Sequence, residues 1–314
     1  MFIAGVLNIS SMDLSKYAAP ILLFGMLLAC FIAVFSRGLM AAGLSVMDVT
    51  FLRLSIAFAG LFVLMLLIHR SWDCFRLNVR DLPLFILFGI FKILSDFSFI
   101  HALDNISVCL ATLLQNTAPY FVMILSYFIF RTRVSRKILM LIMLGTFGCV
   151  LMSGMALLHT NLEPLGIISA LVSALCLSTF YIGTAVTEMK GYTPGTFSFY
   201  VILLSALVSL PFIDAAGIGV ALSDPINIYR AVALGLVSTL IPTYIMAWSV
   251  KYLNPLISVA VCVSEIAFAA LVGAVFFNEA LDIFDCIGMV LMMASIILIS
   301  RQSAIEKRDV ASEE

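Results

Sequence analysis

PLISVAVCVSEIAFAALVGAVFFNE, residues Pro255 to Glu279, is an apolar run long enough to cross a lipid bilayer as one helix. A spanning helix needs about 20 apolar residues, and Glu265 stands near the middle of this run. A carboxylate at the centre of a membrane helix costs about 2.5–3.5 kcal/mol even on lenient insertion scales. The stretch therefore predicts a transmembrane helix whose central charge faces protein, water or a ligand rather than lipid.

The same stretch has a weaker relative earlier in the chain. Moving back by 147 positions places Phe277 on Phe130 and Leu298 on Leu151, and offsets of 145 and 146 pair further segments in the same order. A period of this length in a chain of 314 residues means two copies. Internal repeats in an apolar chain are typical of transporters built from two structural copies.

Composition indicates a bilayer environment for most of the chain. Hydrophobic residues make up 63% of the sequence and charged residues 11%, and the mean hydropathy is +1.17, far from the averages of soluble domains. We therefore predict an integral all-α membrane protein, with a bacterial inner (plasma) membrane as its expected location. The seven cysteines show no CxxC spacing and fall mostly in apolar runs, so they suit packing better than disulfides or metal ligands.

Hydropathy predicts ten transmembrane helices, five in each copy. Because five is odd, the second copy enters the membrane from the opposite face, and the two repeats are inverted. The expected helices are 19–42, 47–69, 82–102, 107–130, 138–158, 164–187, 193–214, 229–250, 255–277 and 282–300. The chain then divides into an N-terminal tail (1–18), a first five-helix repeat (19–158), a second five-helix repeat (164–300) and a C-terminal tail (301–314).

Basic residues orient this arrangement in the membrane. Most lysines and arginines outside the spans fall on one side, whereas only Arg230 lies in a loop of the other side. By the positive-inside rule the basic side is cytoplasmic, and with it both tails. The expected partners are the lipid bilayer and a small-molecule solute. We expect no nucleic acid, and a homodimer stays open.

Three charges at the depth of the membrane centre are the main candidates for solute binding. Lys92 and Glu265 lie near the predicted midplane, and Asp96 follows Lys92 by one turn on the same helix face. Without partners the three would cost about 7–10 kcal/mol, comparable with the stability of a whole domain. We therefore predict that they line a central cavity for a charged or zwitterionic solute. The alternative is an ion pair of Lys92 with Glu265 or Asp96 that only fixes helix packing.

Glu265 is also the candidate for coupling transport to protons. Burial favours the neutral carboxyl group and a nearby Lys92 favours the charged one, so a solute that separates the two would change the protonation of Glu265.

Polar residues beside two prolines of the spans are second candidates for solute contact. Gln115 and Asn116 precede Pro119, and a proline inside a membrane helix frees a backbone carbonyl. Thr239 and Thr243 take the positions of Lys92 and Asp96 in the second copy. Packing between helices explains these four polar side chains equally well.

A further group of charged and aromatic residues has a weaker claim to the site. Arg37 and Arg53 lie within a turn or two of the predicted outer ends of spans one and two, where their side chains reach the interface. The aromatic candidates are Tyr181, Tyr244 and Trp248. Aromatic residues near span ends more often anchor a helix at the membrane interface.

Motifs of the main enzyme classes are missing from the sequence. There is no GxSxG, HExxH or P-loop, and the three histidines lie apart at span ends. We expect no catalytic residue, no metal site and no cofactor. The rival class is an intramembrane enzyme or a lipid-binding protein, in which Lys92, Asp96 and Glu265 would supply an acid–base pair.

The arrangement resembles the drug/metabolite transporter superfamily, EamA type, over about residues 18–300. The resemblance rests on ten spans in two inverted copies, Arg53 near the start of span two, Pro119 in span four and FFNEAL (Phe276 to Leu281) closing span nine. The family pattern has a second proline where this chain has Ile266, and a glutamate where it has Thr132. These departures leave the hinge of the second copy an open question.

The resemblance implies a secondary carrier that exports amino acids, organic acids or other small metabolites by alternating access. The first four helices of each copy would surround the pathway, and spans five and ten would lie outside it as scaffold. The alternative within transport is a carrier of nucleoside-like or cationic drug-like solutes, which Asp96 and Glu265 favour if Lys92 is engaged elsewhere.

Overall fold

The computed structural model describes residues 11–69, 77–106, 108–131, 136–159, 163–253 and 255–277, and residues 283–299 apart from 285, 289 and 296. Within these ranges the regular elements are helices and no strand is present. The elements are α2 (Ser11–Ala29), α3 (Phe31–Met40), α4 (Val46–His69), η2 (Val79–Asp81), α5 (Leu82–Asn105), α6 (Val108–Gln115), α7 (Ala118–Phe130), α8 (Arg136–His159), α9 (Pro164–Met189), α10 (Pro194–Ser209), η3 (Leu210–Phe212), α11 (Ala215–Ala221), α12 (Pro225–Val232), η4 (Ala233–Leu240), α13 (Ile241–Leu253), α14 (Pro255–Cys262) and α15 (Glu265–Phe277).

Seven helical segments in this part of the chain are long and apolar enough to cross a membrane. They are Tyr17–Met40, Val46–Leu67, Val79–Asn105, Leu110–Phe130, Pro164–Met189, Pro194–Phe212 and Pro225–Val250. Helix α8 has 24 residues, and two shorter apolar helices, Ala260–Val272 and Cys286–Ile299, fall within the other predicted spans. The protein is thus an all-helical membrane protein, while the number of ten crossings stays a prediction.

The fourth predicted span of each copy is broken at matching positions. Helices α6 and α7 are separated by Asn116 and Thr117, and α14 and α15 by Val263 and Ser264. Every bound of the second pair lies 147 residues after its counterpart in the first pair, which is the offset that the sequence suggested.

The two breaks have different local causes. Pro119 lacks an N–H group and so interrupts the helical hydrogen bonds of the first copy. In the second copy Ile266 takes that position, yet tight turns still form, with Ser264 N donating to Val261 O at 3.1 Å and Ile266 N donating to Val263 O at 3.2 Å. The second copy therefore has its break without a proline, which answers the question that the sequence left open.

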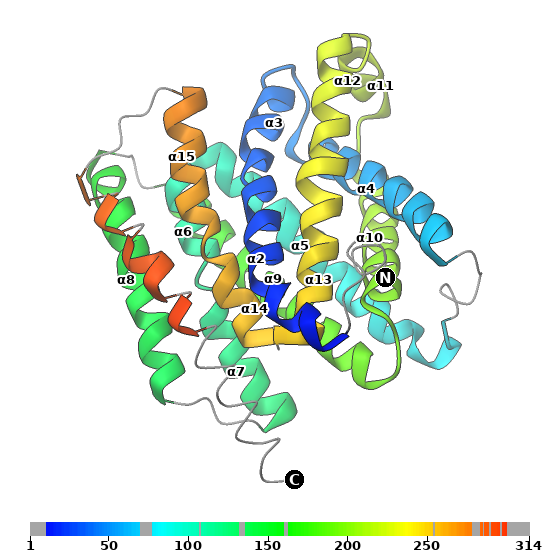
Figure 1. The fold of residues 1–314 in the computed structure, drawn as a ribbon. Coiled ribbons are helices and arrows are strands. Elements are labelled where there is room, and N and C mark those ends of the chain that lie inside the picture. Colours follow the sequence, from blue (N-terminus) through cyan, green and yellow to red (C-terminus); the bar gives the residue numbers. More distant parts are fainter. Residues whose placement is uncertain are drawn as a thin grey trace.

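Helices α2 and α3 form a central unit beside the second break. This unit stands between α13 on one side and the α14–α15 pair on the other (Figure 1). Helix α8 packs at the edge of the bundle against the helix Cys286–Ile299, where a Cβ on Gly148 would lie only 2.7 Å from the backbone oxygen of Gly288. A side chain at position 148 would hold these two helices apart.

The π-helical segment η4 ends at Leu240, two residues before Pro242. Pro242 cannot donate to a carbonyl one turn earlier and its ring needs space, so the preceding turn is widened. Thr239 Oγ1 accordingly donates to Leu234 O, five residues back, at 2.7 Å. Single π turns often occur at functional sites.

Gly235 lets η4 pack closely on α4, and we expect Gly235→Ala to destabilise the fold by about 1–3 kcal/mol. The added Cβ would lie 2.5 Å from Ile56 Cβ and 2.6 Å from its Cγ2, atoms that cannot swing away because they branch next to the backbone. Thermal unfolding in detergent measures the effect. Gly219→Ala is the control, since a Cβ there meets nothing within 4 Å. Equal melting of the two variants would contradict this close contact.

Candidate functional site

A cavity of about 60 Å³ lies where both halves of the chain meet, with walls from α2, α3, α4, α5, α6, α9, η4, α13 and α15. Six of the predicted site residues line it: Arg53, Lys92, Asp96, Gln115, Thr243 and Glu265. Among the described residues, none from α8 or from 283–299 belongs to its wall. The space suits a few water molecules and is smaller than ordinary ligand sites of about 300–1,000 Å³. A metabolite needs the helices to move apart before it fits.

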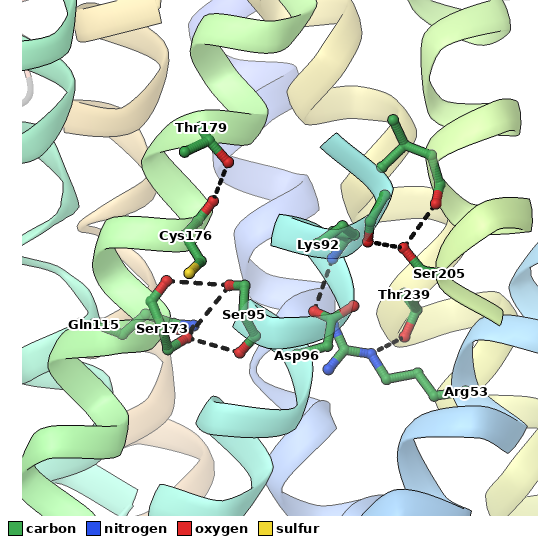
Figure 2. A network of polar contacts seen from close by, with 12 residues as sticks. Arg53, Lys92, Ser95, Asp96, Gln115, Ser173, Cys176, Thr179, Ser205 and Thr239 are labelled. Carbon is green, nitrogen blue, oxygen red and sulfur yellow. Dashed lines mark hydrogen bonds and ion pairs between the residues drawn. The ribbon is translucent and has the colours of Figure 1, made fainter. Parts of the chain in front are cut away.

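Asp96 holds two cations in this cavity. Its Oδ1 atom lies 2.7 Å from Lys92 Nζ, one turn earlier on α5, and 3.2 Å from Arg53 Nη2 on α4 (Figure 2). All three residues are 5% exposed. The i, i+4 spacing predicted the Lys92 contact. The Arg53–Asp96–Lys92 triad therefore carries a net charge of +1 when each group is ionised.

Arg53 lies deeper than the sequence indicated. It was expected to reach the outer interface, but its guanidinium crosses from α4 into the cavity, where Nε donates to Thr239 Oγ1 at 2.9 Å. Thr239, predicted to contact solute, thus fixes Arg53 and is absent from the cavity wall. Arg37 stays away from the cavity and donates from Nη2 to Leu103 O at 3.2 Å.

Several buried polar atoms of the cavity wall lack a hydrogen bond to any described residue. They are Arg53 Nη1, Asp96 Oδ2 and Ser238 Oγ. A buried polar atom left unpaired costs about 1–3 kcal/mol, more when it is charged. The cavity therefore presents a free donor, a free acceptor and a hydroxyl group to whatever fills it.

Glu265 is the first residue of α15, directly after the break in the ninth predicted span. Its carboxylate forms neither an ion pair nor a hydrogen bond with a residue that the structure describes. The Lys92–Glu265 pair considered from the sequence is absent, because Lys92 bonds Asp96. The backbone oxygen of Glu265 accepts from Cys30 Sγ at 3.2 Å, so the junction of α2 and α3 touches the break beside α15.

A second polar group borders the cavity and includes two residues that sequence reasoning missed, Ser95 and Ser173. Ser173 Oγ on α9 donates to Ser95 O at 2.9 Å, and Ser95 Oγ on α5 donates to Ser173 O at 3.1 Å (Figure 2). Gln115 Nε2, just before the first break, donates to Ser173 Oγ at 2.8 Å. Serines are common in membrane helices, so neither serine stands out without its neighbours.

The remaining predicted residues lie outside the cavity wall. Asn116 Nδ2 donates at 2.8 Å to Thr112 O, which also accepts from the backbone N of Asn116 at 2.9 Å. Tyr181 is fully buried and donates to Cys262 Sγ at 2.9 Å, so the suggestion of an interface anchor was wrong. Trp248 packs against Tyr252 with ring centroids 4.7 Å apart, and Tyr244 packs against the apolar cluster of α4 and α10.

The cysteines that the structure describes are unbridged. Cys30, Cys176 and Cys262 are buried among the helices, whereas Cys286 is exposed. The predicted packing role thus fits the first three, and the side chains of Cys74, Cys109 and Cys149 lie outside the description.

Comparison with known proteins covers nearly the whole chain. The sequence profile of the EamA-like transporter family matches residues 16–154 and again 164–301. A protein of Archaeoglobus fulgidus described as an uncharacterized transporter is 27% identical over 289 residues, which are 91% of this chain and 97% of that protein. One crystal structure shares the fold with a TM-score of 0.68 at 18% identity, covering 91% of this chain and 96% of its own. With both halves matched, the chain belongs to the EamA-like transporter family and is a membrane transporter.

Proposed function

We propose that this transporter is a secondary carrier of a small zwitterionic metabolite such as an amino acid. One observation carries the proposal: the Arg53–Asp96–Lys92 triad, with its net positive charge, shares a cavity with the carboxylate of Glu265, which has no partner among the described residues. A solute with one negative and one positive group complements this pair of charges. Charged groups leave water only where such partners replace it.

Each end of the solute has a defined partner in this proposal. The carboxylate of the solute accepts from Arg53 Nη1, the free donor, and is attracted by Lys92. The ammonium group of the solute donates to Glu265. Thr243, Gln115 and Ser238 are the further polar contacts within reach of the cavity.

Alternating access follows from the broken helices in this proposal. Discontinuous membrane helices that meet at a central site are a recurrent device of secondary carriers. The matching breaks at Asn116–Thr117 and Val263–Ser264 let each half-helix tilt while the site between them is kept. Export, a cytoplasmic position of both termini and proton coupling at Glu265 belong to the same proposal. Export rests on the family resemblance, and the orientation rests on the basic residues. The coupling rests on the carboxylate of Glu265, which no described residue pairs with.

Ligand-induced stabilisation tests the solute class, and Glu265→Gln is expected to abolish it. The purified protein is melted with amino acids, organic acids, nucleosides and amines. A solute at 100 times its dissociation constant stabilises the native state by about 2.7 kcal/mol. We expect an amino acid to raise the melting temperature of the wild type and of Glu163→Gln, whose side chain is exposed. An equal shift in Glu265→Gln would contradict the assigned role.

One observation favours a second candidate, a cationic solute. Lys92 and Arg53 both bond Asp96 already, so Glu265 is the cavity charge left without a partner among the described residues. Amines that stabilise the wild type while amino acids do not would replace the zwitterion by a cation. Transport of amino acids by Glu265→Gln with an undiminished response to a pH gradient would end the coupling proposal.

A further inference from the structure

An aromatic cluster separates the cavity from one end of the helix bundle. Its first member, Phe180, lines the cavity, and Lys92 Nζ lies 5.8 Å from the centroid of its ring. From Phe180 the ring contacts run to Phe197 at 5.3 Å and onward to Phe88 at 5.6 Å. We call the buried residues of this cluster the aromatic plug: Phe85, Phe88, Phe180, Phe197, Val201 and Ala247.

A group of polar residues covers the far side of the aromatic plug. Asp81 pairs with Lys190 through Oδ1 and accepts from Tyr192 OH through Oδ2 at 2.7 Å. Asn78 N donates to Tyr192 OH at 3.2 Å, and the ring of Tyr192 meets Phe85 at 5.3 Å. We call Asn78, Asp81, Lys190 and Tyr192 the polar latch. It connects the start of α5 to the turn between α9 and α10.

The parts of this assembly come from both halves of the chain. Asn78, Asp81, Phe85 and Phe88 lie in residues 16–154, the first part of the chain that the family profile matches. The other residues of the plug and the latch lie in the second matched part, residues 164–301. Because plug and latch each contain residues from both halves, a relative movement of the two halves must separate both layers together.

Partial burial and the hydrogen bond to Asp81 raise the pKa of Tyr192, so its hydroxyl stays protonated and remains a donor.

We propose that the aromatic plug and the polar latch form the gate that closes the cavity at the Asp81–Lys190 end of the bundle. The plug excludes water and solute because its rings are buried and in contact. The latch holds the closed position weakly enough to open, since Lys190 is 46% exposed and exposed ion pairs contribute little. The inference rests on the proposed function as a carrier. Arg80 and Lys190 lie at this end of the bundle, so by the positive-inside rule the gate faces the cytoplasm.

Gly183, against which two rings of the plug pack, provides a second way to test this gate. A Cβ on Gly183 would lie 2.9 Å from Phe197 Cζ and 2.9 Å from Phe88 Cδ1, because both rings rest directly on the backbone of α9. Gly183→Ala therefore wedges the rings away from their closed position. Gly219→Ala adds the same methyl group where nothing lies within 4 Å.

Hydroxyl-radical footprinting of the purified protein, read by mass spectrometry, tests the gate without any solute. Met26 lines the cavity and is 1% exposed, so its oxidation reports opening, while Met189, 77% exposed, reports the radical dose. We expect Asp81→Asn, Lys190→Gln and Gly183→Ala each to raise Met26 oxidation about three- to tenfold relative to Met189. Asp224→Asn, an exposed aspartate outside the latch, and Gly219→Ala should leave it unchanged.

Charge reversal separates a specific latch from general loosening. Asp81→Lys should raise Met26 oxidation, and adding Lys190→Asp should return it to within about twofold of the wild type. Unchanged Met26 oxidation in Lys190→Gln and Asp81→Asn would overturn the gate, even with the amino-acid melting shift intact. Loss of that melting shift in the wild type instead speaks against the proposed function and leaves the footprinting result valid.

Discussion

Asp96→Ala is expected to destabilise the folded protein by about 3–5 kcal/mol, the usual cost of removing one partner of a buried ion pair. Asp96 Oδ1 accepts from both Lys92 and Arg53, so its loss leaves two cations without an anion in a site that is 5% exposed. Glu265 is the other anion of the cavity wall, and it makes no bond to either cation. The energy of two unpaired buried charges outweighs the small packing change from the shorter side chain.

Thermal unfolding in detergent measures this effect, and Asp104→Ala is its matched control. Asp104 lies on the same helix α5 but its side chain is exposed, so its removal should change the unfolding free energy by no more than about 0.5 kcal/mol. If both variants melt together, the triad is solvated in the native protein and the cavity is open to water. Lys92→Met combined with Asp96→Ala should recover part of the loss because one unpaired cation is removed.

The sequence predicted contacts within one helix better than contacts between helices. Lys92 and Asp96 are one turn apart on α5, so helix geometry alone brings them together. Arg53 and Glu265 lie on other helices, and hydropathy gives the depth of a residue along a span but not the direction of its side chain. The structure places the long side chain of Arg53 in the triad, while Glu265 has no ion-pair partner among the described residues.

The two helix breaks also differ in how far the sequence alone predicts them. Pro119 marks the first break in the sequence, because a missing N–H is a property of the residue itself. The second break, at Val263 and Ser264, has no such residue, and the prediction of one continuous helix over residues 255–277 was wrong. Tertiary contacts accompany this break, with Cys30 Sγ bonding the backbone oxygen of Glu265. The number of membrane crossings and the bounds of the two repeats stay predictions.

Arg53→Lys is expected to reduce transport by about 10- to 100-fold while the protein still folds. The guanidinium uses Nε on Thr239 and Nη2 on Asp96, and keeps Nη1 free for the solute. An ammonium group has no planar fork and cannot serve all three directions at once. Losing a charge-assisted hydrogen bond costs about 1.5–3 kcal/mol, and each 1.4 kcal/mol is tenfold. Because Lys retains the positive charge, the electrostatic balance with Asp96 is preserved and stability should fall far less than in Asp96→Ala.

Exchange of a labelled amino acid in proteoliposomes measures this prediction, with Arg37→Lys as the matched control. Arg37 makes the same change of side chain outside the cavity wall, where its Nη2 donates to a backbone oxygen. Arg37→Lys should transport within about threefold of the wild type, since no contact of the cavity is altered. If Arg53→Lys transports equally well and still shows the amino-acid melting shift, Arg53 only holds α4 against α5 and η4. The carboxylate of the solute must then be bound by Lys92 alone.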